Sequence, residues 1–335
     1  MPVQDPGPDA PYYVVLNAGS GRTDTELRCA TIREVLAGAG RRCEIELVHE
    51  GARMPDTAAR VAQKAAADGA ILVAAGGDGT LNAVAHEAVR QGCVFGVLPQ
   101  GTFNYFGRTH GIPEDLREAV HALLRARVRH VQVGAVNGRN FLVNASVGLY
   151  PRLLEERELD KRQYGRSRVV AILSALKTAL GRHRNLRIEL DLDGRAHRLR
   201  TPTLFFGNNR LQMAQVGMQP LDHAVQEGRL AAIAPRPVGK WRMLALLLRG
   251  ALGRLGEAED VTAFAFRNMT VRAPFLSGRR RIKVAADGEV CMLELPLRFE
   301  ALEGRLALLV ADPPEASSGP GFGGEDGAAF WAAAQ

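Results

Sequence analysis

The sequence predicts two domains: an N-terminal α/β domain whose parallel sheet is flanked by helices, and a C-terminal domain that is mainly an antiparallel β-sandwich. In residues 11–130, apolar runs typical of buried strands alternate with segments of helical periodicity, which indicates a parallel sheet covered on both faces. In residues 131–310, short alternating runs are separated by turn signals such as Asn137-Gly138 and Asp193-Gly194, which indicates hairpins. The 335 residues suffice for two domains, and the 46% hydrophobic content suffices for packed cores.

The expected elements follow from these periodicities. In the first domain, strands are expected at 11–16, 43–48, 71–75 and 94–98, and helices at 25–39, 55–68, from 81 onward and at 114–127. In the second domain, strands are expected at 131–136, 140–145, 186–192, 203–206, 230–234, 261–266, 269–273, 282–286, 290–295 and 301–310. Residues 1–10 and 311–335 are expected to be disordered tails because of their composition.

One glycine-rich turn marks the centre of the first domain. The apolar run 71–75 ends in Gly76-Gly77-Asp78-Gly79-Thr80, and a helical pattern follows at once, with Thr80 as its expected N-cap. Glycines let backbone N–H groups approach an anion, and a helix N-terminus attracts phosphate. Asp78 would repel phosphate unless Mg²⁺ stood between them, since Mg²⁺ is commonly held by one or two carboxylates together with phosphate oxygens. The turn therefore predicts a metal–phosphate site, although an ordinary strand-to-helix turn has a similar composition.

Two further small-residue turns follow neighbouring strands. Gln100-Gly101-Thr102 comes after the strand 94–98, and Asn17-Ala18-Gly19-Ser20-Gly21 comes after the first strand. In parallel sheets, ligands bind at the carboxyl ends of the strands, so the three turns predict one shared nucleotide site. The site is not the dinucleotide fingerprint, because Asn82 occupies the place of the third glycine, and no Walker-type motif occurs in the chain.

The motifs together resemble the diacylglycerol kinase catalytic domain family. Gly76 to Asn82 is similar to the signature of a superfamily that also holds sphingosine and ceramide kinases and, more distantly, NAD kinases and phosphofructokinases. Pro99 to Arg108 is similar to the lipid-kinase pattern P-x-G-T-x-N-D-F-A-R. The resemblance continues through Asn144 to Pro151 and through Asp287-Gly288-Glu289, so it covers residues 12–310.

The resemblance implies a phosphofructokinase- or NAD kinase-like first domain, to which the last strand returns, and a site for ATP and Mg²⁺. It implies Asp78 as the metal residue, acting through water, and a catalytic set of Glu289 as proton acceptor, Asp287 as its partner and Asp78. From the residues alone, Asp287-Gly288 is more typical of a hairpin turn than of a catalytic site, and only the resemblance favours catalysis. The implied nucleotide-binding residues are Asn17, Ser20, Gly21, Gly76, Gly77, Asp78, Gly79, Thr80, Asn82, Gly101, Thr102 and Asn104.

The chain departs from the family pattern at several positions. Tyr105 replaces an aspartate near the nucleotide, which removes one carboxylate that could assist a metal. Gly107 replaces an alanine, and Ala18 replaces a proline. Residues 217–230 resemble a segment that holds a structural Mg²⁺ in some relatives, but Glu227 stands where those have aspartate.

Charge and composition indicate the kind of partner. The net charge of +7 favours anionic partners, and two stretches without acidic residues, 161–187 and 229–254, combine basic with apolar side chains. These stretches fit either ordinary surface helices or helices that dock on anionic lipid. Nucleic-acid binding is disfavoured, because only 6% of residues are aromatic and no basic–aromatic stacking motif is present.

Four scattered cysteines without a C-x-x-C pair indicate reduced thiols and no metal cluster. The absence of a leader pattern or a membrane-spanning apolar run predicts a cytoplasmic protein that associates peripherally with membranes. A homodimer is compatible with the sequence.

The sequence therefore predicts an ATP-dependent kinase of lipid metabolism that phosphorylates a hydroxyl of a diacylglycerol, a sphingoid base or a related lipid. Two alternatives stay open from the residues. One is a kinase of the same superfamily with a soluble acceptor such as NAD, and the other is a non-enzymatic regulator that binds nucleotide or lipid.

Overall fold

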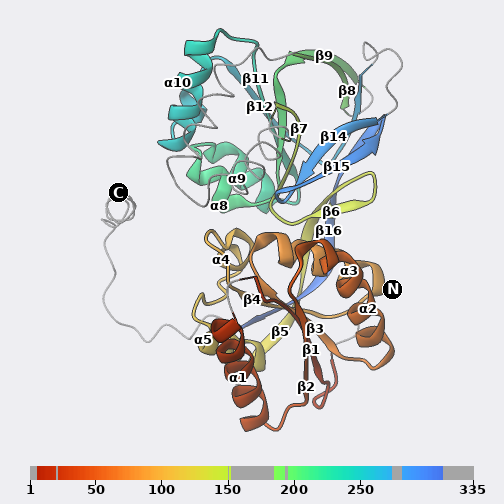
Figure 1. Ribbon diagram of the computed structural model, residues 1–335. Coiled ribbons are helices and arrows are strands. Elements are labelled where there is room, and N and C mark those ends of the chain that lie inside the picture. The colour runs from red at the N-terminus through yellow and green to blue at the C-terminus, as the bar shows by residue number, and fades with distance from the viewer. Residues whose placement is uncertain are drawn as a thin grey trace.

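The computed structural model describes residues 6–19, 22–149, 151, 185–192, 195–273 and 281–311. Two lobes lie one above the other, and the strands β5 (Ala126–Val136) and β16 (Leu297–Ala311) run from one lobe into the other (Figure 1). The two strands pair antiparallel along nearly their whole length. Their register shifts between Leu302 and Leu306, where β16 carries a bulge that includes Gly304 at φ 62°.

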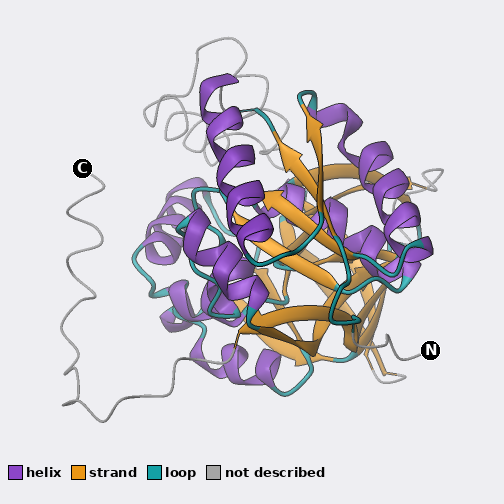
Figure 2. Ribbon diagram, turned by 90° about the horizontal axis from the view of Figure 1, so that it is seen from below, coloured by secondary structure: helices purple, strands orange, loops and turns teal. Residues whose placement is uncertain are grey.

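The N-terminal lobe is built on parallel strands in the order β2-β1-β3-β4, followed by β16. The strands are β1 (Tyr12–Asn17), β2 (Cys43–Val48), β3 (Ile71–Gly76) and β4 (Phe95–Pro99). Helices α1 (Arg22–Gly38) and α5 (Leu116–Leu124) cover one face, and α2 (Met54–Ala67) and α3 (Asp78–Gln91) cover the other (Figure 2). The last described strand, β16, joins this sheet through a parallel pairing of Leu308 with Phe95.

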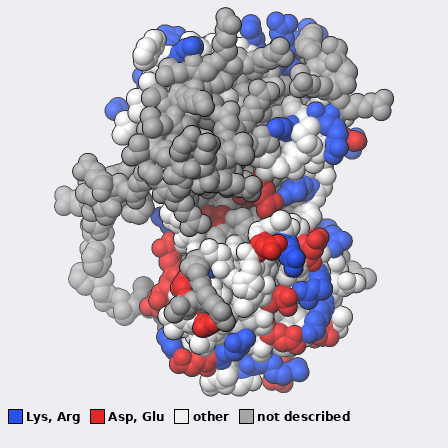
Figure 3. Space-filling view, in the orientation of Figure 1, with Lys and Arg blue, Asp and Glu red and all other residues white. Residues whose placement is uncertain are grey.

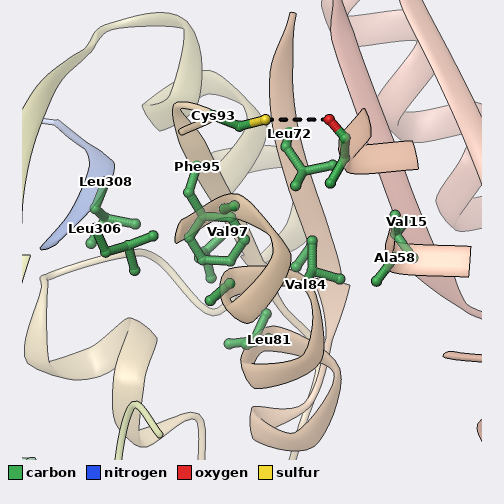
Figure 4. Packing of buried hydrophobic residues seen from close by; sticks show 14 of the residues in the cluster. Val15, Ala58, Leu72, Leu81, Val84, Cys93, Phe95, Val97, Leu306 and Leu308 are labelled. Carbon is green, nitrogen blue, oxygen red and sulfur yellow. Dashed lines mark hydrogen bonds between the residues drawn. The ribbon is translucent and has the colours of Figure 1, made fainter. Parts of the chain in front are cut away.

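The apolar runs of the central strands are continuous because both faces of the sheet are covered. In β3, Leu72 and Ala74 face the α2–α3 side, whereas Val73 faces the α1–α5 side, and all three are fully buried. On the α2–α3 side, Leu81 and Val84 of α3 pack against the central strands (Figure 4).

The C-terminal lobe is a sandwich of two antiparallel layers. One layer continues the first sheet as β16-β13-β8-β9, and the other is a six-stranded sheet in the order β12-β11-β10-β7-β14-β15. The rings of Phe206 and Phe299, one from each layer, stack with centroids 3.7 Å apart in the core between them. The strands are β7 (Asn144–Gly148), β8 (Leu186–Leu192), β9 (Arg195–Thr201), β10 (Thr203–Gly207), β11 (Leu230–Pro235), β12 (Val261–Phe266), β13 (Asn268–Arg272), β14 (Arg281–Ala286) and β15 (Glu289–Glu294).

Shorter elements complete the structure. A short strand, β6 (Arg139–Phe141), pairs with β5, and 3-10 turns lie at Gly51–Arg53 and Leu255–Glu257. The remaining helices are α4 (Tyr105–Thr109), α8 (Arg210–Gln215), α9 (Gln219–Gln226) and α10 (Lys240–Ala251). Among the described helices, none combines the length and the hydropathy that a bilayer crossing requires.

The predicted fold class, a parallel α/β domain followed by an antiparallel region, is confirmed. Two element predictions were wrong in detail. The expected helix 114–127 ends at Leu124, because β5 already begins at Ala126. The expected strand 140–145 is split into β6 and β7 at Leu142 and Val143. Of the predicted tails 1–10 and 311–335, residues 1–5 and 312–335 lie outside the described residues, as does most of the basic stretch 161–187; Ala311 is the last residue of β16.

Candidate active site

The loops that follow β1, β3 and β4 meet at the carboxyl edge of the parallel sheet. Gln100 N donates to Gly76 O at 2.8 Å, and Asn17 Nδ2 donates to the Thr80 hydroxyl at 3.1 Å. The backbones of Gly77 and Gly101 approach so closely that a Cβ on Gly101 would lie 2.8 Å from the Gly77 Cα. A Cβ is therefore excluded at Gly101, and a Cβ on Gly77 would make a tight contact, 3.3 Å from the Gly101 Cα.

The N-terminus of α3 is left without a side-chain cap. The helix begins at Asp78 with Gly77 as its N-cap, and no side chain accepts from the first turn. The prediction that Thr80 caps this helix was wrong, because Thr80 lies within the first turn and its hydroxyl accepts from Asn17. Unpaired N–H groups and the positive end of a 14-residue helix make this turn suited to an anion.

Asp78 joins this turn to the next loop. Its carboxylate accepts from the backbone N–H of Phe106 at 3.4 Å, at the start of α4. Burial raises the pKa of Asp78, while the backbone donors of Phe106 and Tyr105 lower it. A half-buried carboxylate that is fixed in this way beside a helix N-terminus can hold a water or a metal ion in a defined position.

Asn104 fixes the conformation of the loop that follows β4. Its Oδ1 accepts from Gly101 N at 2.7 Å, its Nδ2 donates to Gly101 O at 3.0 Å, and its own backbone has a positive φ of 48°. The side chain is 4% exposed, so its amide is used within the turn. Thr102, two residues earlier, is exposed on the same loop.

Asp287 brings the second lobe to this edge. It sits in the turn between β14 and β15 at φ 45°, and its carboxylate accepts from the backbone N–H groups of Leu142, Val143 and Asn144 at 2.6, 2.9 and 2.8 Å. These bonds replace strand pairing at Leu142 and Val143, which is why the expected strand 140–145 is interrupted. Burial raises the pKa of Asp287 to about 7, against the three amide donors that lower it, and the charge of Asp78 raises it further.

The Asp287 turn lies directly on the first turns of α3. A Cβ on Gly79 would lie 3.9 Å from Asp287 O. With its amide nitrogen turned toward the acceptors, Asn82 donates to Asp287 Oδ2 at 3.1 Å and to Asn140 O at 3.3 Å. Asn82 was predicted to bind nucleotide. In the structure its side chain contacts Asp287, which was predicted to be catalytic.

Glu289 lies two residues further along, at the start of β15. It forms an ion pair with Arg139 at 2.6 Å, and its side chain is 40% exposed. It lines a cavity of about 80 Å³ together with Asn82 and His86 of α3. Burial lowers the pKa of His86, whose Nδ1 accepts from Asn140 N at 3.4 Å. Glu289 therefore borders a cavity and is partly exposed, whereas Asp287 is buried and enclosed by amide donors. Figure 3 shows acidic and basic side chains side by side at the waist between the lobes.

A second cavity, of about 380 Å³, is lined in part by residues of α4. It is lined by Phe106, His110, Gln132 and Asn209, among others. Burial lowers the pKa of His110 to about 4, so its ring is neutral near pH 7. The residue that departs from the family pattern, Tyr105, links the lobes here: its hydroxyl donates to Gln215 Oε1 at 2.7 Å, and its carbonyl accepts from Asn209 at 3.1 Å.

Other predicted residues are placed as follows. Ser20 and Gly21 lie outside the described residues. Glu227 of the segment 217–230 pairs with Arg229. Within the described ranges, no cluster of three His, Cys, Asp or Glu side chains forms a metal cage.

Two basic residues at this edge were missed by the sequence analysis. Arg28 of α1 donates from Nη1 to Gln100 Oε1 at 2.7 Å, which places a guanidinium beside the loop after β4. Arg139 pairs with Glu289. Lone arginines on a helix and on a strand carry no sequence signal that separates them from ordinary surface residues.

Comparison with known proteins assigns a class to this arrangement of sheet and loops. Residues 11–136 match the family model described as the diacylglycerol kinase catalytic domain. A protein of Pseudomonas aeruginosa (strain UCBPP-PA14) named "Probable lipid kinase YegS-like" is 39% identical over 144 residues, which cover 42% of this chain and 44% of that protein. A "Diacylglycerol kinase" of Staphylococcus saprophyticus is 36% identical over 80 residues, which cover 23% and 26% of the two chains.

The fold is also shared with solved structures. The crystal structure of a diacylglycerol kinase from Bacillus anthracis str. Sterne matches with a TM-score of 0.65 at 20% identity, over 90% of this chain and 96% of that one. The similar sequence spans less than half the length of the curated relatives, and the structural likeness shows the fold alone. The α/β domain, residues 11–136, belongs to the diacylglycerol kinase catalytic domain family.

The raised pKa of Asp287 gives a testable dependence of stability on pH. Because the folded-state pKa of about 7 exceeds the reference value of 3.8, the folded state binds the extra proton and loses stability as pH rises through this interval. The difference in unfolding free energy between the wild type and Asp287→Asn should fall by up to about 1.4 kcal/mol per pH unit between pH 5 and 7 and level off above pH 8. Urea unfolding at several pH values measures it. The neighbour Glu289→Gln serves as the control, and an Asp287→Asn difference that does not vary with pH would contradict the assignment.

Proposed function

We propose that the protein is an ATP-dependent lipid kinase that transfers the γ-phosphoryl group to a hydroxyl of a diacylglycerol, a sphingoid base or a related lipid. The observation that carries this proposal is the contact between the Asp287 turn of the C-terminal lobe and the first turns of α3. A carboxylate-bearing turn from one lobe thereby stands beside the glycine loops of the other, and a kinase needs such an arrangement between its acceptor and its nucleotide.

Phosphoryl transfer depends mainly on position and charge. The transferred group needs in-line placement, neutralisation of its charge and an acceptor for the hydroxyl proton. The uncapped first turn of α3 supplies N–H donors, and the guanidinium of Arg28, which is also ion-paired with Asp24, lies beside the loop after β4. In this proposal the nucleotide phosphates lie against residues 76–80 and 101–102, with Asn17 and Asn104 holding the loops in shape through their amide side chains.

The residues fit MgATP as a bound group. The contact between Gly77 and Gly101 and the absence of a side-chain cap at α3 leave backbone N–H groups for phosphate, and Asp78 offers a carboxylate beside them. Since a single carboxylate forms no metal cage, the ion would complete its shell with phosphate oxygens and water. When bound, Mg²⁺ would neutralise charge on the phosphates.

Glu289 is our candidate for the proton acceptor, and Asp287 for the residue that positions it. The Asp287 carboxylate is held by three backbone amides, so it fixes the turn. Glu289 leaves the same turn with an exposed side chain and borders open space. Arg139 keeps the Glu289 carboxylate oriented through their ion pair.

Labelled ATP tests the activity directly. We expect the purified protein with Mg²⁺ and γ-labelled ATP to form a labelled phospholipid from a total lipid extract or from short-chain diacylglycerol, and no labelled product from NAD. Chromatography of the products identifies the acceptor. Product from NAD alone would favour the soluble-acceptor kinase, and MgATP binding without product from any acceptor would favour a non-enzymatic regulator.

Gly101→Ala tests the nucleotide site. The added Cβ would meet backbone atoms of Gly77 at 2.8 Å, and backbone cannot move aside without separating the two loops. We expect MgATP affinity, measured by calorimetry, to fall at least about tenfold, which corresponds to about 1.4 kcal/mol. Gly51→Ala is the matched control in the same lobe, since a Cβ there meets nothing within 4 Å. Equal affinity in the two variants would place the nucleotide elsewhere.

Glu289→Gln separates chemistry from binding. A positioned base contributes typically 10²–10⁴-fold, so kcat should fall by about that factor while MgATP affinity stays near that of the wild type. Glu87→Gln is the control, because Glu87 borders the same cavity from α3. If Glu289→Gln retains full turnover, Glu289 has no part in the proton transfer.

A further inference from the structure

Helix α10 carries an exposed apolar stripe on the outer side of the C-terminal lobe. Trp241 is 78% exposed, Leu248 is 56% and the C-cap residue Leu252 is 72% exposed. Leu247, which is 45% exposed, lies about 120° around the helix from Trp241 and so falls outside this stripe. Half of the large hydrophobic side chains that are exposed in the described part of the chain therefore lie on this one element, and Figure 1 shows it at the periphery beyond α8 and α9.

The stripe points away from the core. At about 100° per residue, Trp241, Leu248 and Leu252 fall within about 40° of one another around the helix. The side chains that anchor the helix, Met243 and Leu246, are 8% and 5% exposed and lie roughly opposite. An amphipathic surface helix needs only one apolar face, toward the core, so the second apolar face on α10 is not required by folding.

Basic residues flank the stripe on both sides. Arg242 and Arg249 lie about 80–100° to one side of Trp241, and Lys240 lies about 100° to the other. The helix contains no acidic residue, and Arg242 forms an ion pair at 3.6 Å with Asp260, which lies outside the helix. Apolar residues in the middle and cations at the edges match a helix that lies in a bilayer interface, with the cations at the level of anionic headgroups.

We propose that α10 docks the protein on the surface of an anionic lipid bilayer, with Trp241, Leu248 and Leu252 inserted among the acyl chains and Lys240, Arg242 and Arg249 against the headgroups. Charge selects a bilayer over a protein partner, because an apolar stripe alone would fit either, whereas cations on both flanks fit a continuous negative surface. Only the purpose of docking, which is to bring the active site to a membrane-borne acceptor, rests on the proposed lipid kinase function.

Trp241 reports on its own insertion. The chain has two tryptophans, so Trp331→Phe leaves Trp241 as the single tryptophan, which can be excited selectively over the tyrosines. In this full-length protein, without nucleotide, we expect vesicles of mixed phosphatidylglycerol and phosphatidylcholine to shift Trp241 emission to shorter wavelength, and pure phosphatidylcholine vesicles to shift it much less. If Trp241 is already shielded from acrylamide in the vesicle-free protein, or if its emission does not respond to vesicles, the proposal is wrong.

Co-sedimentation with the same vesicles separates the two parts of the surface. Trp241→Ser combined with Leu248→Ser should lower binding at least tenfold, and Lys240→Gln combined with Arg249→Gln should remove the preference for phosphatidylglycerol. Leu27→Ser is the matched control, because Leu27 is 67% exposed on α1 of the other lobe. Unchanged binding in the Trp241/Leu248 variant overturns the proposal. The proposal is also overturned if light scattering shows that the wild type is a dimer and that the Trp241/Leu248 variant is a monomer, because a second copy would then cover the helix.

Kinase assays keep this proposal distinct from the proposed function. The Trp241/Leu248 variant should phosphorylate dispersed short-chain diacylglycerol at the wild-type rate and vesicle-borne diacylglycerol at least tenfold more slowly. If the wild type phosphorylates neither acceptor, the proposed kinase function is refuted, and vesicle binding remains an independent result. Equal turnover of the variant and the wild type on vesicle-borne acceptor would show that α10 is not the docking surface.

Discussion

The carboxylate of Asp287 is the point on which the arrangement of the two lobes depends. It accepts from three consecutive backbone amides at residues 142–144, where the chain crosses from β6 in the first sheet to β7 in the second. Amide groups that leave one sheet and have not yet entered another would be buried without partners, which is costly. One side chain satisfies all three, and it does so from a turn that lies on α3. The same contact therefore completes the sandwich and places the β14–β15 turn at the nucleotide edge.

The glycine loops of the candidate site depend on close contact between their backbones. Gly77 and Gly101 touch at a distance that no side chain would permit, and Asp78 and Asn104 fix the two loops from either side. Both polar atoms of the Asn104 amide are used by the backbone of Gly101, so its importance to a nucleotide is indirect: it fixes the shape of the loop after β4. The lobes also meet through Tyr105, whose hydroxyl reaches Gln215. At this position a tyrosine supplies a link between lobes in place of the carboxylate that the family pattern has.

The fold class could be predicted from the sequence because the spacing of apolar residues distinguishes strands from helices. Continuous apolar runs such as 71–75 indicate a strand buried on two faces, and glycine turns after them indicate the edge where a ligand binds. The break at Leu142 and Val143 could not be predicted, because it depends on an aspartate more than 140 residues away. Arg28 was missed for a similar reason, since its contact with Gln100 spans the sheet edge and leaves no local pattern. The role of Thr80 was predicted incorrectly because the helix begins two residues before it, at Asp78.

The bulge in β16 has a consequence for how the lobes can move. The strands β5 and β16 cross the waist as a hydrogen-bonded pair, so this connection between the lobes is not a flexible linker. A hinge rotation of one lobe against the other would break hydrogen bonds between the two strands. The ribbon is interrupted only between Leu302 and Leu306, around Gly304. Deformation is easiest where ladder bonds are already missing. If the lobes move apart to admit a substrate, we expect the β5–β16 pair to twist at this bulge. The separation of the lobes would then depend on the conformation of a few residues of β16.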